Sequence, residues 1–164
     1  MDGGQKTVFW DFDGTLASAG GLWTRSIHAE ILAELPGCGI GIDAVGALNH
    51  TGYPWHDPEA DYRALTRPGA WWTHMEKHFA GVCRTLGTDG AAAARIAGRI
   101  RKRVLDPRNY KLLPGAVEVL SACRARGYAN RILSSNMPEL REILDALELS
   151  PLLDGVLVSA DVGW

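Results

Sequence analysis

Two carboxylates stand one residue apart near the start of the chain, directly after a short apolar run. Asp11 and Asp13 follow Val8-Phe9-Trp10, and Gly14 comes next. Consecutive apolar residues predict a strand that is buried on both faces, as in a parallel sheet. Ligands bind at the carboxyl ends of such strands, and alternate residues point the same way, so both carboxylates can address one site. Such a pair needs a cationic partner, most simply a metal ion.

The same residues have a second interpretation, because Asp13-Gly14 between apolar residues is also a common hairpin turn. The full string Asp11-Phe12-Asp13-Gly14-Thr15-Leu16, directly after a buried type of strand, is more specific than two aspartates and a glycine alone. This string resembles the first motif of the haloacid dehalogenase-like (HAD) hydrolases. The resemblance favours a catalytic site over a turn.

The resemblance implies phosphoryl transfer in two steps. Asp11 would attack phosphorus to give an aspartyl-phosphate, and Asp13 would protonate the leaving oxygen and then activate water. Mg²⁺ would bind Asp11 and the backbone carbonyl of Asp13, and would screen the charges of the carboxylate and the phosphate. Thr15 and nearby backbone amides, those of Phe12 and Gly14, would cradle the phosphate. The similar dehalogenases and phosphonatases lack an aspartate at the position of Asp13, so phosphoryl transfer is favoured over carbon–halogen cleavage.

A second polar group follows another apolar run, in Ile132-Leu133-Ser134-Ser135-Asn136. It is similar to the second HAD motif, a hydroxyl residue that ends the next core strand, which implies phosphate binding by Ser134, or by Ser135 as the fallback, together with Asn136. A hydroxyl and the amides of a helix N-terminus suit a phosphate oxygen. The alternative is that Ser135 and Asn136 only cap a helix, since Glu139 follows Asn136 by three residues.

Between these motifs the sequence pattern is almost entirely helical. Apolar residues recur at helical spacing in four segments: 22–35, 42–48, 71–86 and 96–104. Thr88 or Asp89 can cap the last of them. Residues 51–58 are rich in Gly, Pro and aromatic residues and predict a loop. We therefore expect an all-helical insertion over residues 17–113.

Helix and strand patterns alternate after this insertion. A helical pattern follows Pro114-Gly115 with Val117, Val119, Leu120 and Cys123 as its apolar positions, and strand patterns cover 128–133 and 156–159 on either side of a second helix. This order is typical of a parallel α/β sheet. We expect a Rossmann-like core of about three strands, split into residues 1–16 and 114–164, with the helical cap domain of residues 17–113 inserted after the first strand.

The HAD resemblance also implies groups that this sequence lacks. In similar sequences a lysine and further acidic residues follow the third strand, and they complete the phosphate and magnesium sites. Here no lysine follows Lys111, and neither Asp154 nor Asp161 follows a fourth strand. Three strands would leave Val8–Trp10 as an exposed apolar edge. We expect either that the sequence is truncated or that a homodimer covers this edge.

Two charged groups in the helical segment favour structural roles. His74 and His78 lie four residues apart, but no third ligand has suitable spacing, so a surface or pocket-lining role is favoured over zinc. Arg95, Arg99 and Arg103 form a stripe that is more typical of a solvated helix face than of a site for an anionic substrate tail.

Aromatic residues are dense in the same segment. Some must form its core, but residues 52–57 form a predicted loop, and loops often face ligands. Trp23, Trp55 and His56 are therefore candidates for a substrate cleft.

Composition limits the remaining classes of function. The chain is 46% hydrophobic and 22% charged, which is typical of a soluble domain, and its net charge of -2 gives no reason to expect nucleic acid or an acidic membrane surface. No apolar run approaches the roughly 20 residues of a membrane span. Cys38, Cys83 and Cys123 cannot all pair and suggest reduced thiols in a cytoplasmic protein.

Together these observations predict a Mg²⁺-dependent phosphatase acting on a small-molecule phosphate ester. Two alternatives stay open: a truncated or non-catalytic module that binds phosphate or a partner without turnover, and a phosphomutase on the same scaffold.

Overall fold

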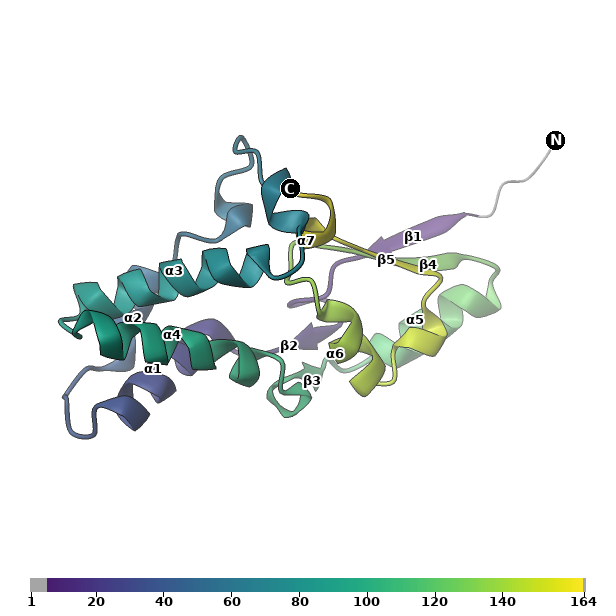
Figure 1. The fold of residues 1–164 in the computed structure, drawn as a ribbon. Coiled ribbons are helices and arrows are strands. Elements are labelled where there is room, and N and C mark those ends of the chain that lie inside the picture. Colours follow the sequence, from purple (N-terminus) through teal and green to yellow (C-terminus); the bar gives the residue numbers. More distant parts are fainter. Residues whose placement is uncertain (1–5, 164) are drawn as a thin grey trace. The chain divides into compact units, whose positions relative to one another are not determined.

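The computed structural model describes residues 6–163 (Figure 1). Their contacts divide the chain into two compact units: residues 6–19 with 110–163, and residues 20–109. We call the first the sheet unit and the second the helical unit. No helix in the described range is long and apolar enough to cross a membrane.

The sheet unit is built on three parallel strands in the order β1-β4-β5. They are β1 (Thr7–Trp10), β4 (Ala129–Ser134) and β5 (Gly155–Val158). Trp10 lies opposite Ile132, and Ser134 lies opposite Val158. Helix α5 (Ala116–Ala125) precedes β4, α6 (Leu140–Ala146) and the short turn η4 (Ser150–Leu152) connect β4 to β5, and α7 (Ser159–Val162) follows β5. The predicted parallel α/β core with three strands is confirmed.

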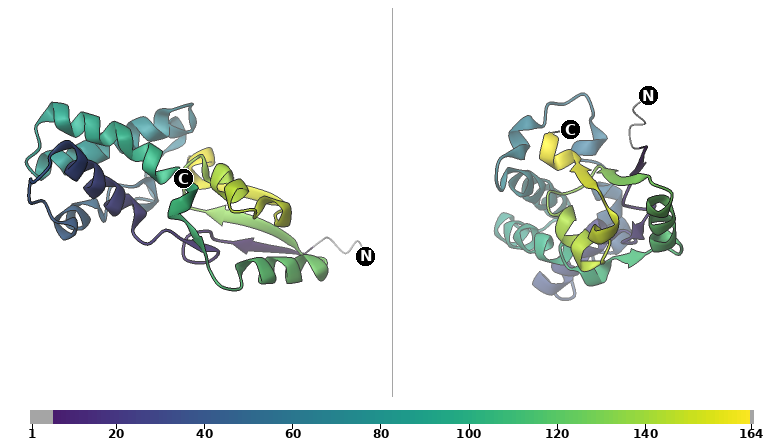
Figure 2. Two further views of the ribbon diagram at one scale, coloured as in Figure 1. Left: turned by 90° about the horizontal axis from the view of Figure 1, so that it is seen from below. Right: turned by 90° about the vertical axis from the view of Figure 1, so that its right-hand side faces the viewer.

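Only one face of this sheet is covered by helices of the sheet unit. Both α5 and α6 lie on that face (Figures 1 and 2), because right-handed crossovers that advance in one direction place their helices on the same side. On the other face Phe9, Leu133 and Leu157 are exposed, Phe9 by 61%. The prediction that Val8–Trp10 is buried on both faces is therefore wrong, whereas its predicted place at the sheet edge is confirmed.

The ends of the expected helical insertion contain two short strands. β2 (Ala17–Ser18) pairs in antiparallel fashion with β3 (Lys111–Leu112), and the amide of Leu113 donates to the carbonyl of Leu16. The structure thus differs from the expectation of helix alone over residues 17–113, since these strands lie in the sheet unit.

Helix α5 packs with fewer apolar residues than its pattern predicts. Ala116 and Leu120 are buried, but Val117 and Val119 are each 40% exposed. The apolar pattern of this segment therefore predicted the helix, but not which of its residues are buried.

The helical unit contains four helices: α1 (Leu22–Glu34), α2 (Ile42–Asn49), α3 (Ala70–Thr85) and α4 (Gly90–Val104). Short 3-10 turns lie between or after them at η1 (Pro54–His56), η2 (Arg63–Thr66) and η3 (Pro107–Asn109). The four predicted helices are confirmed, although η1 interrupts the predicted loop. Asp89 caps α4, because its Oδ1 accepts hydrogen bonds from the amides of Ala91 and Ala92 at 2.9 Å each. The core includes Val45 from α2 and fully buried side chains from α1, α3 and α4: Ile27, Ile31, Met75, Phe79, Ile96 and Ile100.

The arginine stripe of α4 is engaged with two glutamates of α1. Arg99 binds Glu30 at 2.5 Å and Glu34 at 2.8 Å, Arg95 binds Glu34 at 2.7 Å, and Arg103 binds Glu30. Burial alone would raise the pKa of Glu30, but the bonds from Arg99 and Arg103 outweigh it and hold this pKa below its usual value. The arginine side chains are 41% to 57% exposed, as expected of a solvated face, but they also join α4 to α1, which was not predicted.

Candidate active site

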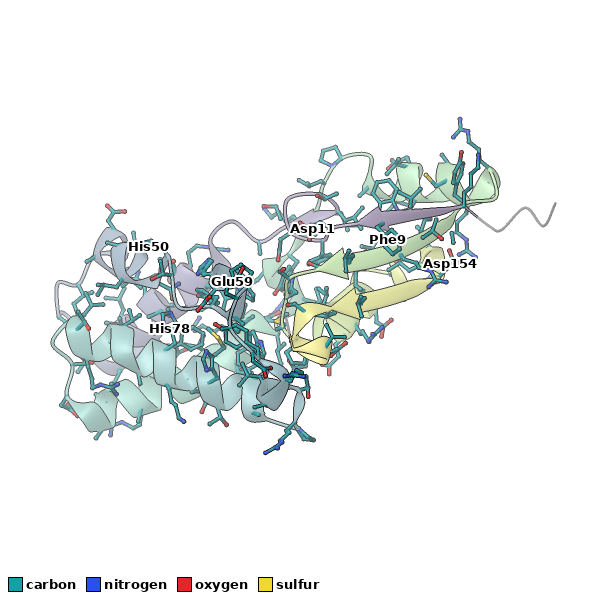
Figure 3. All side chains as sticks on the ribbon, turned by 90° about the horizontal axis from the view of Figure 1, so that it is seen from above. Phe9, Asp11, His50, Glu59, His78 and Asp154 are labelled. Carbon is teal, nitrogen blue, oxygen red and sulfur yellow. The ribbon has the colours of Figure 1, made fainter. Side chains whose placement is uncertain are left out.

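Asp11 lies directly after β1, at the carboxyl end of the sheet (Figure 3). Its Oδ1 accepts two hydrogen bonds, from the backbone amide of Phe12 and from Oγ of Ser134, each at 2.8 Å. Ser134 is the last residue of β4, so the pairing of β1 with β4 brings the two side chains together. Both donors fix the orientation of the carboxylate.

Asp13 is held by a second residue beyond the end of β4. Nδ2 of Asn136 donates to Oδ2 of Asp13 at 2.8 Å. Burial raises the pKa of Asp13 and the nearby charge of Asp11 raises it further, although the bond from Asn136 opposes both. The structure thus joins the two predicted motifs by two separate side-chain bonds, one to each aspartate.

The segment after Asp13 is a tight turn closed by backbone bonds. The carbonyl of Phe12 accepts from the amides of Leu16 at 3.0 Å and Ala17 at 3.1 Å, and the amide of Gly14 donates to the carbonyl of Ala17 at 2.8 Å. Gly14 has φ +78°, a conformation that suits glycine. The turn orients Asp13, since the residues on both sides of it are fixed.

The backbone amides of the predicted phosphate cradle bind groups of the protein itself in this structure. The amides of Phe12, Gly14 and Thr15 all donate within the turn. The side chains of Thr15 and Ser135 are exposed. The roles of these residues toward phosphate stay predictions.

Asn136 does not cap the following helix. α6 begins at Leu140, with Glu139 as the preceding residue and no side-chain cap bond. Asn136 instead uses its amide Nδ2 on Asp13, while its Oδ1 accepts from the amide of Met137 at 2.9 Å. The capping interpretation is thus wrong, because the residues between Asn136 and the helix form a separate turn.

Sequence reasoning missed two residues of this cluster. Oγ of Ser159 accepts from the amide of Asn136 at 3.2 Å, and Ser159 ends an apolar run, the same signal that indicated Ser134. The ring of Tyr110 lies 5.9 Å from that of Phe12 between centroids. Burial raises the pKa of Tyr110, and the nearby charge of Asp13 raises it further. No pattern around Tyr110 predicted this position.

The donor set at the strand end fits Mg²⁺. This ion prefers hard oxygen ligands, keeps several waters, and is often held by one or two carboxylates together with a substrate phosphate. Asp11 would supply a carboxylate oxygen and Asp13 its backbone carbonyl oxygen. Within residues 6–163 no group of three or more His, Cys, Asp or Glu side chains is arranged to hold a metal ion, so the other ligands would be water, backbone carbonyl or substrate oxygens.

The three predicted cleft residues lie in the helical unit. Trp23 packs among Tyr53, Trp55 and Phe79, with ring centroids 5.4, 6.4 and 6.1 Å away. Trp55 is partly exposed and His56 is exposed. Trp23 therefore contributes to the packing of this unit, and the substrate role of all three residues stays a prediction.

Comparison with known proteins is consistent with this arrangement of motifs. A model of the family described as haloacid dehalogenase-like hydrolase matches residues 5–163. A search of curated proteins found no match.

Solved structures share the fold at low sequence identity. The proposed HAD-hydrolase YfnB from Bacillus subtilis, solved with magnesium, has a TM-score of 0.69 at 15% identity. The match covers 98% of this chain and 67% of the YfnB chain. A proposed beta-phosphoglucomutase from Thermotoga maritima has a TM-score of 0.67 at 15% identity, covering 96% and 63%. A predicted phosphatase from Clostridium acetobutylicum has a TM-score of 0.56 at 18% identity, covering 97% and 63%. The chain thus spans about two thirds of the length of the structures it matches.

Proposed function

Because this chain belongs to the haloacid dehalogenase-like hydrolases, we propose that it hydrolyses a small phosphate monoester through an aspartyl-phosphate. One observation carries the proposal: two aspartates follow β1, and each is held by a different side chain from the end of β4. Ser134 holds Asp11 and Asn136 holds Asp13. This separation gives the two carboxylates different environments, as a nucleophile and a proton donor require.

Asp11 is the nucleophile in this proposal. Its Oδ1 is fixed by the amide of Phe12 and by Ser134, so we assign the attack on phosphorus to Oδ2. The bond to the leaving oxygen breaks as the Oδ2–P bond forms. Water then attacks the acyl-phosphate, which releases inorganic phosphate and restores the carboxylate.

Asp13 is the proton donor and later the proton acceptor. Its raised pKa keeps a proton on the carboxyl to a higher pH than in an ordinary aspartate, which suits a group that must protonate an alkoxide leaving group. Once deprotonated, the same carboxylate takes a proton from the attacking water. An alkoxide needs such an acid and a halide does not, which favours phosphate esters over haloacids, although 2-haloacid dehalogenases are also among the structures matched.

Asp11 and Asp13 would hold Mg²⁺. When bound, the ion neutralises part of the charge on the phosphate and the carboxylate, so that the two anions can approach. Ser134 and Asn136 each bind one of the two carboxylates. They hold the carboxylates apart and orient them before a ligand binds.

A test of this proposal is the hydrolysis of p-nitrophenyl phosphate with and without Mg²⁺. We expect Mg²⁺-dependent turnover that Asp11→Asn abolishes. In a reaction quenched with acid, mass spectrometry should find the added mass of the phosphoryl group on Asp11. Glu118→Gln, at an exposed carboxylate of α5, is the matched control and should retain full activity. Activity of Asp11→Asn equal to that of the unchanged chain would exclude Asp11 as the nucleophile.

Binding without turnover is the second candidate. It is favoured by the observation that residues 6–163 bring no group of three metal-ligating side chains together. In that case the chain would bind phosphate or vanadate in a calorimetric titration, Ser134→Ala would weaken the binding, and p-nitrophenyl phosphate would stay intact at every Mg²⁺ concentration.

A further inference from the structure

His78 lies at the centre of the contacts that hold the segment Gly52–His56 onto the helical unit (Figure 3 labels His78). The ring nitrogen Nε2 of His78, on α3, lies 3.1 Å from Oδ1 of Asn49, the last residue of α2. The hydroxyl of Tyr53 donates to the same oxygen at 3.0 Å. Since that amide oxygen can only accept, Nε2 carries the proton and donates it, so Nδ1 of a neutral His78 carries none.

The Nδ1–Cε1 side of the ring lies where a side chain at Gly52 would be. A Cβ on Gly52 would lie 2.4 Å from both Nδ1 and Cε1 of His78, and Gly52 has φ +90°. Only a glycine lets the chain approach the imidazole this closely. A second proton on the ring would add bulk and a full positive charge at this contact.

The segment fastened in this way carries two aromatic residues. Tyr53 stacks on Trp55 with centroids 4.8 Å apart and an interplanar angle of 15°, and Trp55 stacks on Trp71 of α3 at 6.4 Å. The edge of the Tyr53 ring also meets His78, at 5.4 Å. Release of Gly52 from His78 would therefore loosen the stack that orders Trp55.

The surroundings of His78 resist a positive charge. Burial lowers the pKa of His78, and two other histidines lower it further, His74 on α3 and His56 on η1. Asn49 on α2 contributes only a neutral amide.

Charged side chains on the elements that pack against α3 bind other groups. The glutamates of α1, Glu30 and Glu34, pair with three arginines of α4: Arg95, Arg99 and Arg103. Arg101 of α4 lies over the ring of Trp72. Arg63 of η2 pairs with Asp61. They do not supply His78 with a counter-ion.

We propose that His78 is a proton-operated latch: neutral, it fastens Gly52–His56 to α2 and α3, and protonated, it releases this segment and its aromatic stack. The direction of the pH response follows from the lowered pKa of His78. A histidine that is harder to protonate in the folded unit favours the closed form above its ordinary pKa of about 6.5 and loses that contribution as the pH falls below it. Acid therefore opens the latch. The inference concerns the helical unit alone and does not rest on the proposed hydrolase activity.

Hydrogen exchange of the whole chain tests the latch. We would measure amide exchange by mass spectrometry at pH 7.5 and pH 5.0, corrected for intrinsic rates, for peptides covering residues 51–57 and, as a folding control, α4. The amide of His56 donates to the carbonyl of Tyr53 at 2.9 Å and reports the closed segment. Its corrected exchange should rise at pH 5.0, by up to about tenfold for each pH unit below the ordinary histidine pKa of about 6.5. The amides of α4 should stay protected.

Three variants make the test decisive. His78→Gln cannot be protonated but can donate to Asn49, so its corrected exchange should be equal at the two pH values. Gly52→Ala forces a Cβ into the ring and should exchange fast at both. His74→Gln should retain the response with its midpoint moved to higher pH, because His74 is one of the charges that lower the pKa of His78. A response that persists in His78→Gln, disappears in His74→Gln, or spreads equally to α4 would overturn the proposal.

Discussion

Oγ of Ser134 donates to Oδ1 of Asp11 over 2.8 Å, although 123 positions separate the two residues along the chain. The bond exists because Trp10 pairs with Ile132 and thereby aligns the ends of β1 and β4. The proposed nucleophile is thus oriented by a hydroxyl from the neighbouring strand, and the strand pairing determines where that hydroxyl lies.

Ser134→Ala tests the importance of this bond. Loss of one preorganised donor typically costs about 100-fold or more in turnover, so we expect a fall of that order in kcat for p-nitrophenyl phosphate. Thermal stability should change little, since the end of the strand keeps its backbone pairing. Ser121→Ala, on the exposed side of α5, is the control. If Ser135→Ala lowered kcat more than Ser134→Ala, the assignment of the second motif to Ser134 would be wrong.

The sequence predicts the parts of the fold that repeat a local pattern. Periodic apolar residues located all four helices of the helical unit within a few residues, and the alternation of helix and strand predicted the parallel sheet. Asp11, Asp13 and Ser134 were singled out because they follow or end apolar strands and resemble motifs of the HAD family, and the structure brings them to one edge of the sheet. Their catalytic roles stay predictions.

Errors arose where the outcome depends on distant partners. Phe9 was expected to be buried because apolar runs usually lie between two layers, but here one layer is absent from the described residues. The ion pairs of the arginine stripe were not predicted because Glu30 and Glu34 lie more than 60 positions away. Asn136 was read as a cap because its partner Asp13 is equally remote. Local patterns cannot identify such long-range partners.

Glu30→Gln should destabilise the helical unit. Glu30 is 8% exposed at its side chain, but its partners Arg99 and Arg103 are 41% and 43% exposed, so we expect a loss of about 1 to 2 kcal/mol in the free energy of unfolding rather than the larger cost of a fully buried pair. Urea unfolding at pH 7 measures it. Glu34→Gln, whose carboxylate is more exposed, should lose less.

The same variant gives a pH test. The pKa of Glu30 is lowered in the folded unit, so its contribution to stability is present above the ordinary glutamate pKa of about 4.3 and is lost as the pH falls through the lowered value. The stability difference between the unchanged chain and Glu30→Gln should therefore shrink steadily below pH 4. A difference that stays constant down to pH 2 would show that the carboxylate charge is not its cause.

Gly14→Ala and Gly98→Ala should change stability in opposite directions. Neither added Cβ would meet an atom within 4 Å, but Gly14 has φ +78° and Gly98 is in α4. An alanine at Gly14 is strained by about 1 to 2 kcal/mol, whereas an alanine inside a helix gains up to about 1 kcal/mol over glycine. Thermal unfolding followed by circular dichroism measures both changes. Equal signs would mean that the turn after Asp13 does not hold Gly14 in the left-handed conformation.

Phe9→Lys should reduce the tendency of the chain to self-associate. Phe9, Leu133 and Leu157 are exposed on the same face of the sheet, where Leu133 lies opposite Leu157 and Phe9 lies opposite Arg131. Phe9, labelled in Figure 3, is on β1, the edge of that sheet. An apolar strand at a free edge pairs readily with other chains, and a lysine there opposes pairing. Sedimentation velocity over a range of concentrations, with fluorescence of an apolar dye, measures the effect. Val117→Lys, at a valine of α5 that is also exposed, controls for added charge alone: if both variants reduce association equally, the exposed apolar face of the sheet is not its cause.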